Sequence, residues 1–151
     1  MTNDLGDLYQ EVILEHSKAP RNFKRLESAN RQAEGYNPLC GDRCSVFIDY
    51  EGDAIKEIGF QGSGCAISRA SASMMTQMLK GKTREDALKL FEQFHSMVTG
   101  KEDVAANAAE LGKLKVFAGV SKFPARVKCA TLAWHTLQSA LEDKKEAVST
   151  E

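Results

Sequence analysis

The sequence is poor in proline and has no long apolar run. Its 151 residues include three prolines and eleven glycines, which leaves little room for extended linkers. No apolar stretch approaches the roughly 18 residues that a membrane-spanning helix needs. The first ten residues, MTNDLGDLYQ, lack a basic segment followed by an apolar one, as a secretory signal would have. We therefore expect one cytoplasmic domain over residues 1–151, no membrane partner, and a frayed polar tail over 143–151.

Neither sign of charge predominates. Lys and Arg number 20 against 21 for Asp and Glu, which gives a formal net charge of -1. The sequence has no basic stripe with interleaved aromatic residues of the kind that nucleic-acid-binding proteins use. Nucleic acid is therefore not an expected partner.

A compact Cys-x-x-Cys zinc motif is also absent, although the chain holds four cysteines, at positions 40, 44, 65 and 129. Without a secretory signal, the reducing cytosol makes metal binding or sulfur chemistry a better interpretation than disulfides. The function should therefore depend on how the fold places these cysteines.

Alternating apolar residues predict a small antiparallel β-sheet. The run from Cys44 to Tyr50 alternates with mostly polar neighbours, residues 51–53 form a turn, and residues 54–60 are again rich in β-branched and aromatic side chains. This pattern is typical of a β-hairpin. A further short strand is expected near Arg31–Ala33, which makes about three strands.

Apolar residues at spacings of three and four predict several α-helices. Pro20 ends the first helix, Thr83 followed by Asp86 resembles a capping arrangement, and Pro124 suits the first turn of the last helix. Helices packed against a small antiparallel sheet make an α+β domain. The apolar stripes cover residues 5–16, 67–79, 87–98 and 127–141, and a further short helix closed by Gly119 is expected within 101–122.

Three cysteines and one aspartate lie at the ends of predicted elements. Cys40 and Asp42 precede the hairpin, Cys65 comes just ahead of a helix, and Cys129 lies in the opening turns of the last helix. Helix N-termini stabilise negative charge, so Cys65, and less strongly Cys129, should favour the thiolate form. Three thiolates and a carboxylate would close a tetrahedral zinc shell, in which Asp42 is the harder and more readily exchanged ligand. Spacing alone is weak support, because these positions match no compact zinc motif.

Three separated segments carry a family resemblance: NPLCGD at 37–42, GSGCAISRASASMM at 62–75, and AGVSKFPARVKCATLAW at 118–134. Together they resemble the SufU branch of the IscU/NifU-like iron–sulfur cluster assembly proteins, and the similarity extends from the first helix to Trp134. The resemblance implies zinc ligation by Cys40, Asp42, Cys65 and Cys129. It also implies that Cys129 receives sulfur from a SufS-type cysteine desulfurase, a pyridoxal-phosphate enzyme that brings its own cofactor.

Two details favour the SufU branch over scaffold-type IscU proteins, which have a histidine immediately before the last cysteine and a shorter segment between the second and third cysteines. Here Lys128 occupies the histidine position, and residues 101–122 look like the extra segment. The loss of an imidazole beside the cluster ligands weakens the interpretation as a scaffold.

Two further residues bear on the site. Cys44 alternates with Val46 and Ile48, so a buried small apolar side chain is a better interpretation than a fourth sulfur ligand. Arg126 lies three residues before Cys129, on a neighbouring part of the same helix face, where it could stabilise a thiolate or contact a partner. A solvated arginine near a helix start is an equally good interpretation.

These observations leave three functional hypotheses. The first is a zinc-dependent sulfurtransferase, in which Cys129 accepts a persulfide sulfur and passes it to an iron–sulfur scaffold or a small-thiol acceptor. The second is a scaffold that binds iron or assembles a transient [2Fe–2S] cluster on the same cysteines. The third is a regulatory zinc module that only binds and activates the desulfurase.

Overall fold

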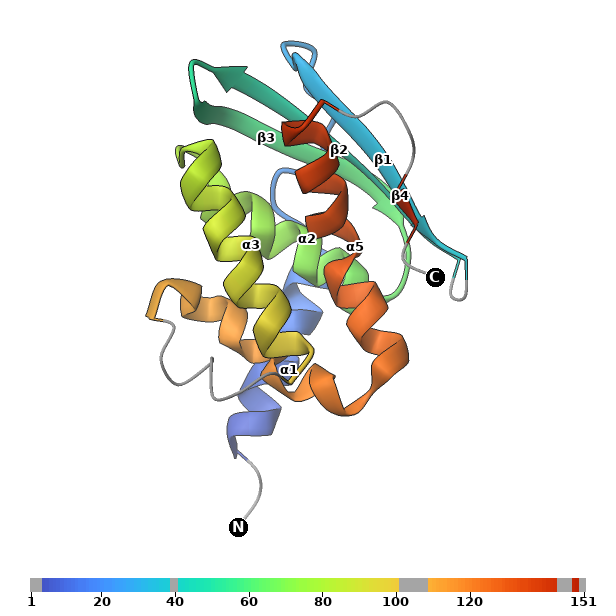
Figure 1. The fold of residues 1–151 in the computed structure, drawn as a ribbon. Helices are drawn as coiled ribbons and strands as arrows, with labels where there is room; N and C mark the ends of the chain where they lie inside the picture. Colours follow the sequence, from blue (N-terminus) through green and yellow to red (C-terminus); the bar gives the residue numbers. More distant parts are fainter. Residues whose placement is uncertain (1–3, 39–40, 101–108, 144–147, 150–151) are drawn as a thin grey trace.

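The computed structural model describes residues 4–38, 41–100, 109–143 and 148–149. A sheet lies on one side of the molecule, and helices cover one of its faces (Figure 1). This arrangement confirms the predicted α+β class. The elements in chain order are α1 (Asp4–Lys18), β1 (Arg31–Asn37), β2 (Asp42–Glu51), β3 (Ala54–Ser63), α2 (Ala66–Leu79), α3 (Arg84–Val98), η1 (Ala109–Lys122), α5 (Pro124–Leu141) and β4 (Val148–Ser149).

The sheet has the strand order β3-β2-β1-β4. β1, β2 and β3 pair antiparallel, with Val46 opposite Ala33 on one side and Phe60 on the other. These three strands confirm the predicted hairpin and the expected strand near residue 31. β4 adds a short parallel pairing with β1 at Gly35 and Tyr36. It lies within the 143–151 tail, where the sequence has no strand pattern.

The helix boundaries follow local capping chemistry. The Thr83 side chain accepts a hydrogen bond from the Asp86 amide and caps α3, and Pro124 is the first residue of α5, as the sequence predicts. The segment at 109–122 differs from expectation, because it is a 3-10 helix that continues past Gly119. Gly112 has a φ of 50° and a ψ of -125°, outside helical geometry, so a kink there divides the segment into two short helices.

The core lies between the sheet and the helices, and Trp134 of α5 is at its centre. Trp134 is fully buried, stacks on Phe94 with ring centroids 4.7 Å apart, and donates its indole N–H to Ser71 Oγ at 3.1 Å. Ser71 in turn donates to the Ala130 carbonyl at 2.6 Å. This hydroxyl therefore joins α2 to α5.

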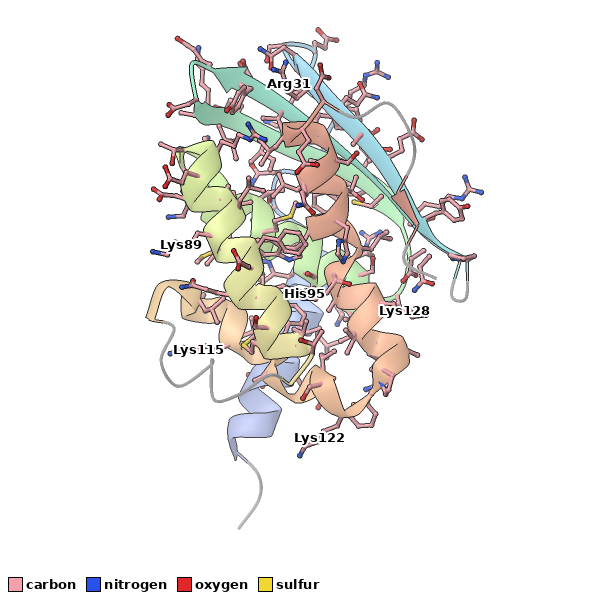
Figure 2. All side chains as sticks on the ribbon, in the orientation of Figure 1. Arg31, Lys89, His95, Lys115, Lys122 and Lys128 are labelled. Carbon is pink, nitrogen blue, oxygen red and sulfur yellow. The ribbon has the colours of Figure 1, made fainter. Side chains whose placement is uncertain are left out.

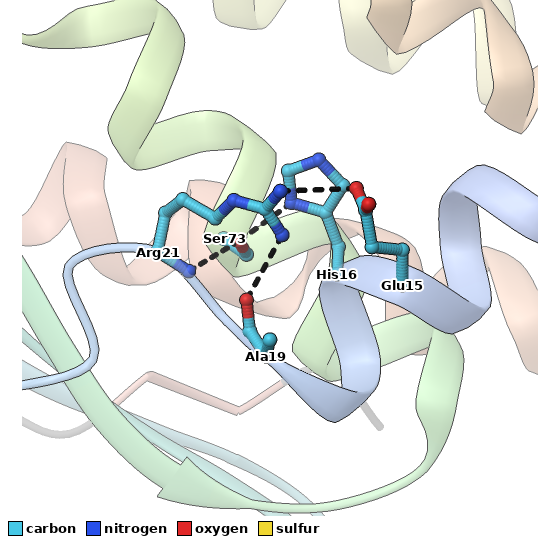
Figure 3. A network of polar contacts seen from close by, with 5 residues as sticks. All are labelled: Glu15, His16, Ala19, Arg21 and Ser73. Carbon is cyan, nitrogen blue, oxygen red and sulfur yellow. Dashed lines mark hydrogen bonds and ion pairs between the residues drawn. The ribbon is translucent and has the colours of Figure 1, made fainter.

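A second hydroxyl fixes the end of α1 (Figure 3). Ser73 Oγ of α2 accepts a hydrogen bond from the Arg21 amide at 2.8 Å and lies 2.7 Å from Nδ1 of the buried His16. Burial and the nearby Arg21 lower the pKa of His16. The neutral imidazole is therefore favoured here as part of the helix packing.

Candidate functional site

Three of the four predicted ligands meet where β2, the start of α2 and the start of α5 come together. One ligand atom from each of Asp42, Cys65 and Cys129 lies within 4.8 Å of the others. Asp42 and Cys129 are buried, whereas Cys65 is exposed. Cys40, the fourth predicted ligand, lies outside the described residues. In the part of the chain that the structure describes, this is the one group of three such side chains close enough to share a metal ion.

Cys65 is the N-cap of α2, and its sulfur acts as the cap. Its backbone is extended, with φ -72° and ψ 169°, and Sγ accepts a hydrogen bond from the Ser68 amide at 3.5 Å. Serine, threonine, aspartate or asparagine usually supply this contact. The sequence expectation that Cys65 lies just ahead of a helix is confirmed, and the cap directs amide hydrogens at its sulfur.

The Asp42 carboxylate is held against Cys65. Its Oδ1 accepts from the Cys65 amide at 3.0 Å, and Oδ2 lies 3.8 Å from Cys65 Sγ. Gly64 makes room for this arrangement, because a Cβ at that position would lie 2.6 Å from Asp42 Oδ1. Any larger residue at position 64 would therefore require the Asp42 carboxylate to shift.

Cys129 lies six residues into α5, beyond the first helical turn. Its sulfur is 3.9 Å from Nδ2 of the buried Asn37 at the end of β1. Asn37 pairs with Asp42 in the β1–β2 register, so the end of this two-strand unit contributes two polar side chains to the site. The sequence analysis missed Asn37, although it belongs to the NPLCGD segment; a polar residue at the end of an alternating strand was the available signal.

The two thiols share one proton when no cation lies between them. The pKa of Cys65 is lowered to about 6, first by its hydrogen bond with Cys129 and then by the Ser68 and Ile67 amides. The pKa of Cys129 is raised by the same hydrogen bond, by burial and by Asp42. The expectation that Cys129 also favours the thiolate is therefore wrong for this state, because its hydrogen bond with Cys65, its burial and the nearby Asp42 all raise its pKa.

The donor set fits a tetrahedral thiophilic metal. Zinc with Zn–S bonds of about 2.3 Å holds two sulfur ligands roughly 3.8 Å apart, so ligand atoms within 4.8 Å of one another need only small shifts. A divalent cation at this position would favour the charged form of all three groups. Two thiolates with a carboxylate suit zinc or iron better than magnesium or calcium.

A cavity of about 610 Å³ opens beside the two sulfurs. Cys65 and Cys129 form part of its wall, and the exposed side chains of Leu14 and Phe123 add to its apolar rim. A macromolecular partner or a ligand can therefore reach Cys129, although that residue is itself buried. The lining residues are Gln10, Ile13, Leu14, Cys65, Ala66, Ile67, Val116, Gly119, Val120, Phe123, Ala125, Arg126 and Cys129.

Arg126 lies on the wall of this cavity, with its guanidinium 4.9 Å from the centre of the Phe123 ring. It is exposed, as a residue that contacts a partner would be. Lys122 and Lys128, labelled in Figure 2, belong to the end of η1 and the first turns of α5. Of these three cations, Arg126 is the one that lines the cavity.

The remaining thiol and imidazoles are not part of the site. Cys44 is 4% exposed and belongs to the apolar core, where burial raises its pKa to about 12; the prediction that it is a core residue is confirmed. His95 of α3 (Figure 2) contacts His135 of α5, with ring centroids 5.7 Å apart. Within the described residues, no histidine belongs to the group that could hold a metal.

A model of the NifU-like N-terminal domain matches residues 8–130. The chain is 44% identical over 138 residues to the zinc-dependent sulfurtransferase SufU of Bacillus subtilis, and the match covers 91% of this chain and 92% of that protein. It is 43% identical over 143 residues to the iron–sulfur cluster assembly scaffold protein IscU of Streptococcus pyogenes, with 95% and 88% of the two chains covered.

A solved structure gives the same result. A crystal structure of a putative iron–sulfur cluster assembly scaffold protein for the SUF system from Fervidobacterium islandicum aligns with a TM-score of 0.81 at 37% identity. That alignment covers 87% of this chain and 94% of the other. No helix in the described ranges is long and apolar enough to cross a membrane.

Proposed function

The chain belongs to the family of NifU-like N-terminal domains, and from this we propose that it is a zinc-dependent sulfurtransferase that accepts persulfide sulfur from a SufS-type cysteine desulfurase for iron–sulfur cluster assembly. The observation that carries the proposal is the convergence of Asp42, Cys65 and Cys129, of which the two cysteines line an open cavity. A carboxylate among thiolates is a ligand that can leave without loss of the whole site.

In this proposal Cys40, Asp42, Cys65 and Cys129 hold the zinc ion. When bound, the ion would keep the thiolates deprotonated at neutral pH. Asp42 has an alternative partner within reach, because its Oδ1 already accepts from the Cys65 amide. The carboxylate can therefore give up a metal bond and remain hydrogen-bonded.

Cys129 is the proposed acceptor. Its thiolate attacks the outer sulfur of the desulfurase persulfide, a new S–S bond forms on Cys129, and the desulfurase cysteine leaves as a thiolate. The reaction exchanges one S–S bond for another and needs no oxidant. Arg126, on the wall of the cavity, is the proposed contact for the negative charge that the incoming persulfide brings. The sulfur then passes to a downstream scaffold or a small-thiol acceptor.

A second candidate is a scaffold that assembles a transient [2Fe–2S] cluster on the same ligands. Identity of 43% to a protein named as an IscU scaffold favours it. Thiolates ligate iron–sulfur clusters as readily as zinc. The lysine at position 128, where scaffold-type proteins would have a histidine, is the feature that makes the sulfurtransferase the stronger candidate.

The test combines metal analysis with mapping of the persulfide. The protein as isolated should contain about one zinc per chain, and after incubation with desulfurase and free cysteine, alkylation and mass spectrometry should find a persulfide at Cys129. Cys129→Ser should lose both the persulfide and the stimulation of desulfurase turnover.

The matched control is Cys44→Ala, which removes a thiol from the core and should leave zinc content and persulfide formation unchanged. Iron and sulfide in place of zinc would favour the scaffold. A persulfide on Cys40 or Cys65, or full stimulation by Cys129→Ser, would contradict the role of Cys129.

A further inference from the structure

Asn37 is a fully buried amide that contacts the sulfur of Cys129. Its side chain is 0% exposed and that of Cys129 is 3% exposed, and Nδ2 lies 3.9 Å from Sγ. Sulfur is larger than oxygen, so an N–H···S bond is longer than an N–H···O bond. The amide nitrogen can only donate, so the hydrogen bond runs from Asn37 to the sulfur.

The other groups around this sulfur act in the opposite direction. Asp42 and Cys65 both face Cys129 within 4.8 Å, and both are negatively charged when ionised. Like charges this close repel, so both neighbours oppose a negative charge on Cys129. The Asn37 amide is a donor placed against the same atom, at a buried position where a hydrogen bond to a charged partner is strongest.

The backbone fixes the position of Asn37. It is the last residue of β1, opposite Asp42 in the register, and its carbonyl accepts from the Gly41 amide at 2.8 Å. This carbonyl contact does not depend on the side chain. A substitution at position 37 therefore removes the donor to Cys129 and leaves the hydrogen bond that closes the strand end.

We infer that Asn37 is a positioning residue for Cys129: its side-chain amide holds the acceptor sulfur in place and shields it from adventitious reaction. The benefit of a fixed sulfur rests on the proposed function, in which Cys129 must meet the persulfide of a partner. The hydrogen bond draws electron density from the sulfur, as outer hydrogen bonds to metal ligands do in general.

The test compares two cysteines in the same molecule. Zinc-saturated wild type and Asn37→Leu, which keeps nearly the same shape but has no donor, are alkylated briefly with iodoacetamide, and mass spectrometry counts the label at Cys129 and Cys65. The ratio of Cys129 to Cys65 labelling should rise roughly three- to tenfold in the variant, as the loss of one hydrogen bond predicts. General loosening of the site would raise both and leave the ratio unchanged, and that result would overturn the inference.

Two further variants keep the test decisive. Asn30→Leu removes an amide just before β1 that donates to the Tyr50 carbonyl at 2.6 Å, and it should not change the ratio. Asn37→Ser, whose hydroxyl is too short to reach the sulfur, should raise the ratio as Asn37→Leu does, and it replaces that variant if leucine prevents folding. An unchanged ratio in Asn37→Ser would also overturn the inference.

A kinetic measurement separates this inference from the proposed function. With the desulfurase as sulfur donor, Asn37→Leu should lower kcat for transfer, because the freed sulfur is no longer held where it meets the persulfide of the partner. KM for the desulfurase should be unchanged, since Asn37 does not line the cavity beside the sulfurs. An increase in KM alone would argue against positioning. If the wild type accepts no persulfide at all, the proposed function fails. The alkylation ratio still decides whether Asn37 holds and protects the Cys129 sulfur.

Discussion

The hydroxyl of Ser71 joins the two helices that present the site cysteines, and its removal should be costly. Ser71→Ala leaves the buried Trp134 N–H without the acceptor that it has at 3.1 Å, and it removes the bond to the Ala130 carbonyl. An orphaned buried donor costs about 1–3 kcal/mol. For a chain of this size, each kcal/mol lowers the melting temperature by about 2–4 °C, so we expect a decrease of roughly 2–12 °C.

Ser139 provides a matched control in α5. It is also buried, and within the described part of the chain its Oγ has no hydrogen-bond partner. Ser139→Ala removes a hydroxyl that is desolvated without compensation, so its free energy of unfolding should be unchanged or slightly higher. Both substitutions lie in helices, so the gain in helix propensity from alanine is similar and cancels in the comparison.

Urea unfolding at saturating zinc, followed by far-UV circular dichroism and by Trp134 fluorescence, measures both variants on the same scale. The expected order of free energies of unfolding is Ser139→Ala equal to or above wild type, and Ser71→Ala below it. Equal destabilisation by the two substitutions would refute the reasoning, because the loss would then come from the missing oxygen atom and not from the contacts that it makes.

Two other predictions concern the site and the response to pH. Gly64→Ala should weaken zinc binding roughly tenfold or more, measured in competition with a chelator dye, because a Cβ 2.6 Å from Asp42 Oδ1 would push the carboxylate away and break its hydrogen bond with the Cys65 amide. The control is Gly119→Ala, whose Cβ meets nothing within 4 Å and which should bind zinc as wild type does. Equal affinities of the two variants would contradict the argument. Burial lowers the pKa of both His16 and His135 below 6.5 in the folded protein. As the pH falls through 6.5, the unfolded chain therefore binds more protons than the folded chain, and the free energy of unfolding should fall between pH 7.5 and 5.5. His135→Gln should reduce that slope, and an unchanged slope would remove His135 from the explanation.

The sequence was most informative where local chemistry determines structure. Alternation from Cys44 to Tyr50 defined the hairpin, and Thr83 and Pro124 marked helix starts because capping depends on a few adjacent residues. β4 could not be predicted, because a two-residue parallel pairing leaves no periodic pattern. The 3-10 helix was expected to be a short helix, and its irregularity follows from Gly112.

The site could be predicted only in part. Asp42, Cys65 and Cys129 are separated by 23 and 64 positions in the chain, so periodicity could not bring them together and the family resemblance had to supply the set. Their convergence agrees with that set, while the ligand role of Cys40 remains a prediction. The acidity of Cys129 depends on which neighbours face it in three dimensions, and the sequence-based expectation failed there.

The sulfur cap of α2 means that modification of Cys65 and modification of Cys129 have different effects on the helices that carry them. An ordinary hydroxyl cap is chemically inert, but at Cys65 the atom that ends the helix can also be oxidised, alkylated or sulfurated. Any such change at Cys65 disturbs the Ser68 amide contact and frays the start of α2. Cys129 lies inside α5 and its sulfur does not cap the helix, so it can be modified repeatedly without unwinding α5.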